Sequence, residues 1–192
     1  MITLRTERLL LRPLRRADAA TLAVMAGDAR VATKLADIAL PFDELAARRW
    51  LKPTWMDVRL GIERDEKLIG SLSYHYAFGA VGGLGYWLGA EHWGQGYASE
   101  AASAIVCHGF AQDRMQRFLS AHFIDNPASG RVLGKLGFRP FGRGNDWCQA
   151  RGQKVEAIYY ALTRAQAGYA PARSPWSAWL GLAPIRGLRV GA

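Results

Sequence analysis

The stretch HWGQGYASEA, from His92 to Ala101, places two glycines one residue apart, just before a run of small residues. Glycine adopts backbone dihedrals that other residues avoid, and it lets another group approach the backbone closely. From Ala98 to Phe110 the apolar residues follow the i, i+3, i+4, i+7 spacing of an amphipathic helix. A turn that opens a helix offers unpaired N–H groups and the positive end of the helix dipole. We therefore interpret the loop around Gly94 and Gly96 as a cradle for a diphosphate.

Two known phosphate-binding loops and a ligand-free turn share features with this segment. A Walker loop needs a lysine after its last glycine, and the sequence offers none within reach. A dinucleotide fingerprint has glycine or alanine where this chain has Ser99, and it normally follows the first strand of a βαβ unit. A tight strand-to-helix turn that binds no ligand is the third alternative, and it stays open at the level of sequence.

A second stretch, DNPASGRVLGKLGF, runs from Asp125 to Phe138 and predicts another capped helix. Asn126 stands at the cap, and Pro127 stands at the first helical position, where its missing N–H costs nothing. Gly137 is placed to end the helix in a left-handed turn. Ser129 falls on the apolar stripe, so it and Asn126 can bind polar groups of an extended ligand. Alternatively, Asn126 only caps the helix and Ser129 bonds back to it.

Together, YWLGAEHWGQGYASEA and DNPASGRVLGKLGF resemble the GNAT superfamily of acyl-CoA-dependent N-acyltransferases, specifically its RimJ/RimL-like branch. The resemblance covers about Leu9 to Leu162 and includes the opening TERLLLRPL. It implies a mixed α/β GNAT fold, with a central, mostly antiparallel sheet that splays into a V and is flanked by helices. It also implies acetyl-CoA as the cosubstrate. Trp93 stands where the wider superfamily has glutamine or arginine, as is usual in this branch.

The resemblance also implies roles for individual residues. The strand before the loop would splay from its neighbour and pair with the pantetheine arm through Trp87 and Leu88. Asn126 would contact the pantetheine, and Ser129 would lie near the sulfur as a candidate general acid for the leaving thiolate. The glycine loop would wrap the pyrophosphate of acetyl-CoA through Gly94, Gln95, Gly96, Tyr97, Ala98 and Ser99.

The rest of the chain alternates strand-like and helix-like periods without an internal repeat. We expect one acetyltransferase domain over residues 1–165 and an irregular C-terminal extension over 166–192, which packs on its own domain or docks on a partner subunit or an anionic membrane surface. The expected strands are Arg8–Pro13, Val58–Arg64, Leu68–Tyr76, Leu84–Leu88, Arg117–Phe123, Trp147–Ala150 and Val155–Leu162. The other expected helices run from a cap at Asp18 to Gly27, and from Phe42 to Leu51 with Leu45, Ala46 and Arg49 along one face.

Composition narrows the function classes. The chain has 192 residues, of which 50% are hydrophobic, enough for one well-packed domain. Its two cysteines form no CxxC pair and its four histidines show no ligand spacing, so we expect a cytoplasmic protein without a metal. Arginines interrupt the apolar start, and neither end could span a bilayer, so no stable membrane insertion is expected. The formal charge of +9 fits an anionic ligand or a solvated basic surface. We expect no nucleic-acid partner, and a homodimer is possible.

The expected reaction is direct attack of a neutral primary amine on the acetyl thioester. The acceptor would be a small molecule or the α-amine of a protein or peptide N-terminus. The acid–base candidates beyond Ser129 are Asp146, Glu156, His75 and Tyr159, each of which could equally serve a surface or packing role. The lack of an evident base keeps two alternatives open: a non-catalytic domain that binds acyl-CoA or a protein partner, and a nucleotide-sugar or dinucleotide enzyme.

Overall fold

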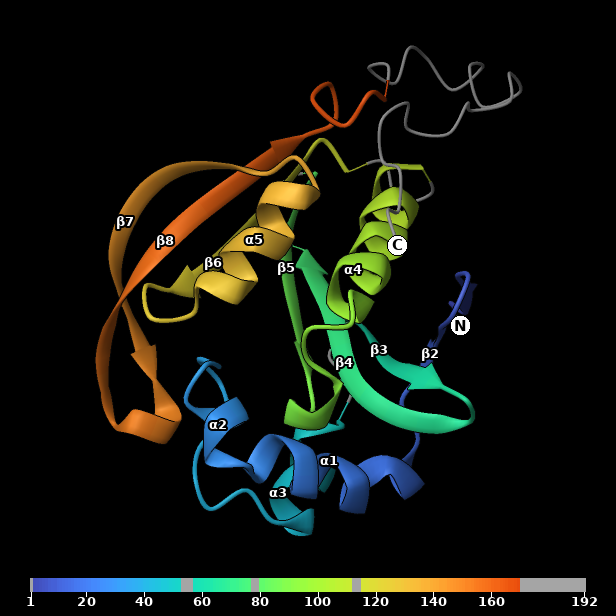
Figure 1. Ribbon diagram of the computed structural model, residues 1–192, viewed down its shortest axis with the longest axis vertical. Coiled ribbons are helices and arrows are strands. Elements are labelled where there is room, and N and C mark those ends of the chain that lie inside the picture. The colour runs from blue at the N-terminus through green and yellow to red at the C-terminus, as the bar shows by residue number, and fades with distance from the viewer. Residues whose placement is uncertain (1, 53–56, 77–79, 112–114, 170–192) are drawn as a thin grey trace.

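The computed structural model describes residues 2–52, 57–76, 80–111 and 115–169, which form one sheet flanked by helices (Figure 1). The strand order in this sheet is β1-β2-β3-β4-β5-β6-β8-β7. The strands are β1 (Leu4–Arg5), β2 (Leu10–Pro13), β3 (Asp57–Arg64), β4 (Lys67–Tyr76), β5 (Val81–Leu88), β6 (Arg117–Phe123), β7 (Arg139–Cys148) and β8 (Gln153–Thr163). The α-helices are α1 (Ala19–Gly27), α2 (Ala29–Ala32), α3 (Glu44–Trp50), α4 (Tyr97–Ala111) and α5 (Pro127–Lys135).

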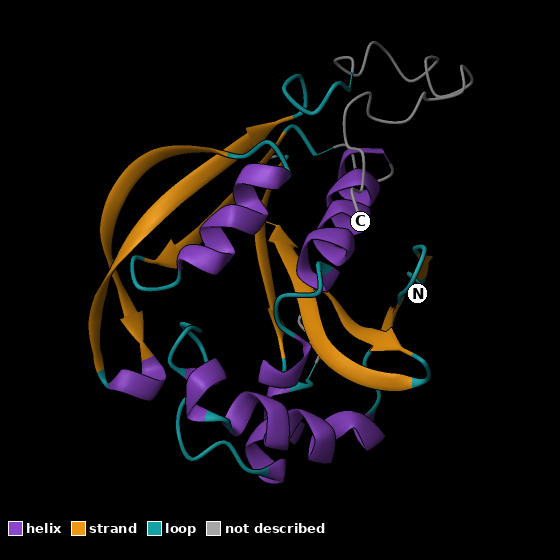
Figure 2. Cartoon of the chain, in the orientation of Figure 1, coloured by secondary structure: helices purple, strands orange, loops and turns teal. Residues whose placement is uncertain are grey.

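The helices form two groups around the sheet (Figure 2). α4 and α5 lie in front of the central strands, whereas α1, α2 and α3 gather at the lower end of the same view. The main core joins apolar residues of the sheet to the buried face of α4, which includes Ala101, Ile105 and Phe110. The amphipathic spacing that follows the glycine loop therefore buries the face that the sequence predicts.

The sheet divides between β5 and β6, which is the only parallel pair recorded for the described strands. β5 pairs with β4 as far as Leu88, but its pairing with β6 covers only Val81 to Gly83. Just beyond Gly83 the Ser120 hydroxyl donates to the Leu84 carbonyl at 2.9 Å. The sheet therefore splays into the V that the family resemblance implies, and the mixed α/β, mostly antiparallel GNAT fold is confirmed.

Two details of the N-terminal helices differ from the sequence-based expectations. Asp18 precedes α1 but makes no side-chain cap, because its carboxylate accepts hydrogen bonds from the Arg12 guanidinium at 2.8 and 3.0 Å and from the Arg15 backbone N–H at 2.6 Å. In α3 the buried residue is Ala47, whereas Leu45 is 57% exposed. The face of this helix that the sequence analysis names is therefore not the face that is buried.

Most of the expected C-terminal extension lies outside the described residues, so its docking stays a prediction. In the part that is described, Tyr169 packs against Phe110 of α4, with 5.5 Å between the ring centroids. No helix among the described residues is long and apolar enough to cross a membrane. The described residues also hold no group of three or more His, Cys, Asp or Glu side chains placed to bind a metal ion.

Candidate functional site

The glycine loop joins β5 to α4 through two residues in the left-handed region. Gly94 has φ +77° and Gly96 has φ +82°, conformations that side-chain-bearing residues rarely adopt. The Glu100 N–H donates to the Gly96 carbonyl at 3.1 Å and so closes the first turn of α4. The amides of the preceding residues have no acceptor within the helix, so they can bind an anion.

The loop is tied to the N-terminal segment of the chain through Arg8. The Arg8 guanidinium lies 2.7 Å from the Glu100 carboxylate and donates to the Gln95 carbonyl at 3.1 Å. It also covers the Tyr97 ring at 4.7 Å, with Arg64 at 4.9 Å from the same ring. The Tyr97 ring is buried in the core, so this residue can offer a ligand only its backbone.

Glu100 is a buried carboxylate in the first turn of α4. Burial alone raises its pKa, but hydrogen bonds from the Thr6 hydroxyl at 2.5 Å and from the Arg8 backbone N–H and guanidinium more than offset that effect. The pKa of Glu100 therefore lies below its usual value, and the group is ionised at neutral pH. The positive charge of Arg8 balances the negative charge of Glu100, and without this balance the carboxylate would repel an anion bound at the loop.

Acid should destabilise the protein through Glu100. A carboxylate with a lowered folded pKa contributes stability above its unfolded pKa of about 4.3, and that contribution is lost as the pH falls through the folded value. We expect Glu100→Gln to cost about 2 kcal/mol at pH 7, because it weakens the charge-assisted hydrogen bonds to this group, and to make the unfolding midpoint vary less between pH 5 and pH 2. Thermal unfolding over this range measures both effects. Asp65→Asn, at an 81% exposed carboxylate, should keep the wild-type pH dependence. Parallel curves for Glu100→Gln and the wild type would refute the assignment.

Beyond Gly83, where its pairing with β6 ends, every second residue of β5 directs its backbone N–H and C=O groups into the gap between β5 and β6. Gly89 N–H donates to the Ile69 carbonyl at 3.0 Å, and such hydrogen-bonded pairs recur at every second residue of an antiparallel ladder. The backbone groups of Tyr86 and Leu88 therefore point away from β4. The Trp93 indole donates to the Leu88 carbonyl at 2.9 Å. What Leu88 can offer a ligand in the gap is its N–H.

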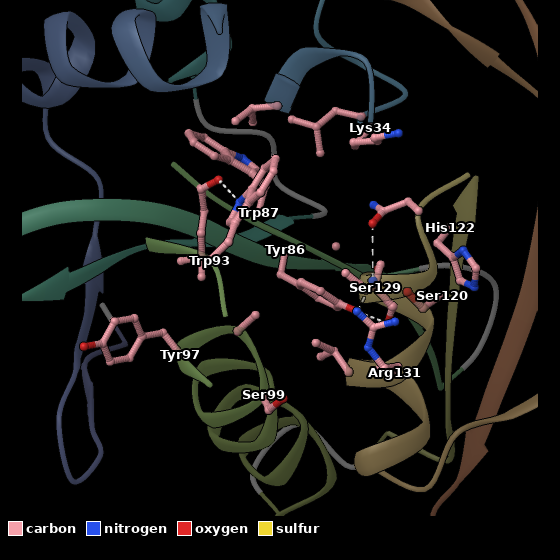
Figure 3. Close-up of a pocket in the computed structure, with 18 of the residues that line it drawn as sticks. Lys34, Tyr86, Trp87, Trp93, Tyr97, Ser99, Ser120, His122, Ser129 and Arg131 are labelled. Carbon is pink, nitrogen blue, oxygen red and sulfur yellow. Dashed lines mark hydrogen bonds between the residues drawn. The ribbon is translucent and has the colours of Figure 1, made fainter. Parts of the chain in front are cut away.

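α5 brings Ser129 to the opposite side of the same gap. Asn126 caps the helix, since its side-chain oxygen accepts from the Ser129 N–H at 3.4 Å. The Ser129 hydroxyl is directed across the gap rather than back to its own helix, and it lies 2.9 Å from the Tyr86 hydroxyl (Figure 3). Tyr86 also donates to the Ser129 carbonyl at 3.0 Å. Because a phenol has one hydrogen, the Ser129 hydroxyl is then the donor to Tyr86.

The Tyr86 phenol stays protonated over the ordinary pH range. Burial raises its pKa, the hydrogen bond with Ser129 opposes this rise, and the nearby Tyr160 adds to it. The Tyr86–Ser129 pair therefore holds a proton inside the gap at neutral pH. The sequence did not single out Tyr86, although it immediately precedes Trp87 in a strand whose residues alternate between the two faces.

The gap and the loop form one cavity of about 550 Å³. Gln95 does not line it: its carbonyl accepts from Arg8, and its side-chain oxygen lies 3.4 Å from an Arg64 nitrogen. The other residues to which the resemblance gives a role do line it. They are Trp87, Leu88, Gly94, Gly96, Tyr97, Ala98, Ser99, Asn126 and Ser129.

Among the described residues, five basic ones that sequence reasoning did not single out also line the cavity: Lys34, His92, His122, Arg131 and Lys135. Arg131 and Lys135 stand four residues apart on α5, a spacing that puts both on one face and that the sequence could have signalled. Lys34 and His122 carry no such local signal, because other parts of the fold bring them to the cavity.

His122 is packed tightly beneath α5. Its Nδ1 lies 2.8 Å from the Phe123 carbonyl, which can only accept, so Nδ1 carries a hydrogen, and Nε2 lies 3.3 Å from the Tyr160 hydroxyl. A Cβ at Gly130 would lie 2.6 Å from Nε2. A glycine at this position therefore allows the imidazole to reach the cavity.

The four other acid–base candidates lie elsewhere. Asp146 accepts from the Tyr159 hydroxyl at 2.8 Å, and Glu156 pairs with Arg143 at 3.3 Å. His75 packs over Gly83, where an added Cβ would meet the imidazole. None of the four is among the residues that line the cavity.

The chain is similar to several known acetyltransferases. Residues 8–139 match the family model described as an acetyltransferase (GNAT) domain. The chain is 28% identical over 177 residues to the uncharacterized N-acetyltransferase p20 of Bacillus licheniformis, covering 86% of this chain and 98% of p20. It is 33% identical over 79 residues to the ribosomal-protein-serine acetyltransferase of Escherichia coli (strain K12), covering 40% of this chain and 44% of that protein. The solved structure of Mycobacterium smegmatis RimJ in complex with CoA-disulfide superposes with a TM-score of 0.74 at 20% identity, covering 85% of this chain and 86% of that chain.

Proposed function

The chain belongs to the GNAT acetyltransferase family and is an acetyltransferase, and we propose that it transfers an acetyl group from acetyl-CoA to a primary amine by direct attack. The observation that carries this proposal is the continuity of one cavity from the glycine loop into the gap between β5 and β6. A long cofactor with phosphates at one end and a reactive thioester at the other requires such a path.

The groups that line the cavity are chemically suited to the successive parts of coenzyme A. Loop amides at the start of α4 suit the pyrophosphate, and the basic side chains of Arg131 and Lys135 supply further positive charge on α5. The outward-facing backbone of Tyr86 and Leu88 can pair with the amides of the pantetheine arm as a missing strand would. The structure of M. smegmatis RimJ holds CoA as a disulfide, which is consistent with this use of the fold.

Residues near the end of the gap have distinct tasks in this proposal. The cosubstrate would supply an acetyl thioester, and in this proposal the Leu88 N–H polarises its carbonyl. The Ser129 hydroxyl would turn from Tyr86 to donate its proton to the leaving thiolate, and the Tyr86 hydroxyl would then reprotonate Ser129 across their 2.9 Å contact. The proton that the attacking amine releases on forming the amide would restore the Tyr86 phenol. Holding amine and thioester together supplies much of the remaining acceleration.

The absence of a carboxylate among the described lining residues favours a weakly basic acceptor. An α-amine with a pKa near 8 is about one-tenth neutral at pH 7, so deprotonation costs roughly 1.4 kcal/mol. A lysine side chain with a pKa near 10.4 would cost roughly 4.6 kcal/mol. We infer that the acceptor is an α-amine rather than a lysine. The E. coli relative, named a ribosomal-protein-serine acetyltransferase, is consistent with a protein N-terminus as the acceptor.

A thiol-release assay with acetyl-CoA over a panel of amines tests the proposal. We expect turnover with α-amines at neutral pH and slower turnover with lysine side chains. Coenzyme A binding without turnover on any amine would instead favour a non-catalytic acyl-CoA-binding domain. Adding NAD and coenzyme A separately in a melting assay tests the dinucleotide alternative, because the true ligand raises the unfolding midpoint.

A further inference from the structure

The cavity has two ends with different surroundings (Figure 3). Ser99 and Arg131 lie toward one end, beside the start of α4 and on α5, where the proposed cofactor phosphates would bind. Lys34 lies at the other end, on the segment after α2, with Trp87 and His122 below it in the same view. If the proposed function is correct, the cofactor fills the first end, and the end at Lys34 receives the acceptor.

Lys34 is a positioned cation. Its Nζ lies 3.2 Å from the Asp125 carboxylate and donates to the Asp125 carbonyl at 3.1 Å. The same carboxylate accepts from the Arg151 guanidinium at 2.7 Å. Two cations thus share one anion, so Lys34, Asp125 and Arg151 together carry a net positive charge; we call these three residues the rim. The Lys34 side chain is 30% exposed, which leaves it accessible to an incoming group.

The backbone around Lys34 is fixed by the tip of the β7–β8 hairpin. The Arg151 guanidinium donates to the Thr33 carbonyl at 2.9 Å, and the Cys148 thiol donates to the Leu35 carbonyl at 3.3 Å. The Gln149 N–H donates to the Ala36 carbonyl at 3.1 Å. A cation on a segment held this way loses little conformational freedom when it binds a ligand.

The charges along the cavity are of one sign. Lys34, Arg131 and Lys135 are the charged side chains among the described lining residues, which include no Asp or Glu. A polycationic acceptor would meet like charges there, and an anionic group would be attracted. Arg131 and Lys135 are accounted for by the cofactor phosphates, but Lys34 is not. Beside Lys34, Val31, Leu35 and Trp87 supply an apolar wall for the uncharged part of an acceptor.

We propose that the acceptor is a primary amine that carries a carboxylate close to the amine, and that Lys34 binds this carboxylate. The ion pair would orient the amine toward the thioester end of the gap. Two sources share this chemistry: a free α-amino acid, and a peptide with an acidic residue next to its N-terminus.

Matched acceptors that differ in one charge test the proposal. The tripeptide amides Ser-Glu-Ala and Ser-Gln-Ala form the peptide pair and have the same N-terminal amine. Serine and serine amide form the free amino acid pair, and their rate constants are divided by the fraction of each amine that is neutral at the assay pH. For at least one pair we expect kcat/KM to favour the carboxylate-bearing member about tenfold. Lys34→Met should reduce that ratio to about one, whereas Lys34→Arg should keep most of it. Lys67→Met removes an exposed charge outside the cavity lining, and it should leave the ratio unchanged.

Calorimetry on the protein loaded with coenzyme A separates this inference from the proposed function. Tighter binding of the carboxylate-bearing member by the wild type, lost in Lys34→Met but not in Lys67→Met, supports the inference even without turnover. Equal affinities within both pairs, no binding of any acceptor, or a ratio unmoved by Lys34→Met would overturn it. A thermal unfolding midpoint for Lys34→Met shows whether the rim survives, as expected while Arg151 still holds Asp125.

Discussion

The Gly96→Val variant should bind coenzyme A at least about 100-fold more weakly than the wild-type protein. Gly96 has φ +82°, and a β-branched residue is strongly disfavoured there. Its Cβ would also lie 3.3 Å from the Arg8 guanidinium that holds the loop. A distorted loop no longer directs its amides at the pyrophosphate. Losing two charge-assisted hydrogen bonds of roughly 1.5 kcal/mol each corresponds to about that factor.

Gly168→Val is the matched control for this change. Gly168 has φ +77°, and a Cβ there would meet nothing within 4 Å, but it does not line the cavity. Both variants should lose thermal stability because valine cannot adopt the native backbone without strain. Only Gly96→Val should lose affinity in a calorimetric titration with coenzyme A. Unchanged affinity in Gly96→Val would remove the loop from the binding site.

Ser129→Ala should lower kcat about 100-fold while changing the KM for acetyl-CoA much less. Proton donation by a positioned group typically contributes factors of about 10² to 10⁴, and it acts on the leaving thiolate rather than on the bound cosubstrate. Tyr86→Phe should also lower kcat, because it removes the proton that replaces the one given up by Ser129. Steady-state kinetics of each variant measure both constants.

The double variant tests whether the two hydroxyls act as one unit. If the proton passes from Tyr86 through Ser129, removing both should cost about as much as removing Ser129 alone. Ser73→Ala, at a serine of β4 that does not line the cavity, should keep the wild-type kcat. Independent losses that multiply in the double variant, or an unchanged kcat in Ser129→Ala, would contradict the relay.

Local signals in the sequence predicted the segments that matter most for the site. The spacing after the glycine loop gave the buried face of α4, and Asn126 with Pro127 gave the start of α5. The resemblance to the GNAT superfamily and the fold it implies are both confirmed, and RimJ of M. smegmatis is among the structures with a similar fold. These predictions succeeded because helix caps, glycine turns and helical periodicity depend on residues that are neighbours in the sequence.

Features set by distant parts of the chain escaped prediction. Asp18 has the residue type of a helix cap, but the guanidinium of Arg12 on β2 occupies its carboxylate instead. In α3, contacts with α1 bury Ala47 rather than Leu45, which a local pattern cannot reveal. Lys34 and His122 reach one cavity only because α2 and β6 flank the same gap.

Isothermal titration of the unmodified protein with coenzyme A tests the central claim most directly. If amides at the mouth of α4 and the free edge of β5 hold the cofactor, the titration should saturate at one molecule per chain. Adenosine, which lacks both the phosphates and the pantetheine arm, should produce little heat. A flat coenzyme A titration on folded protein would contradict the account.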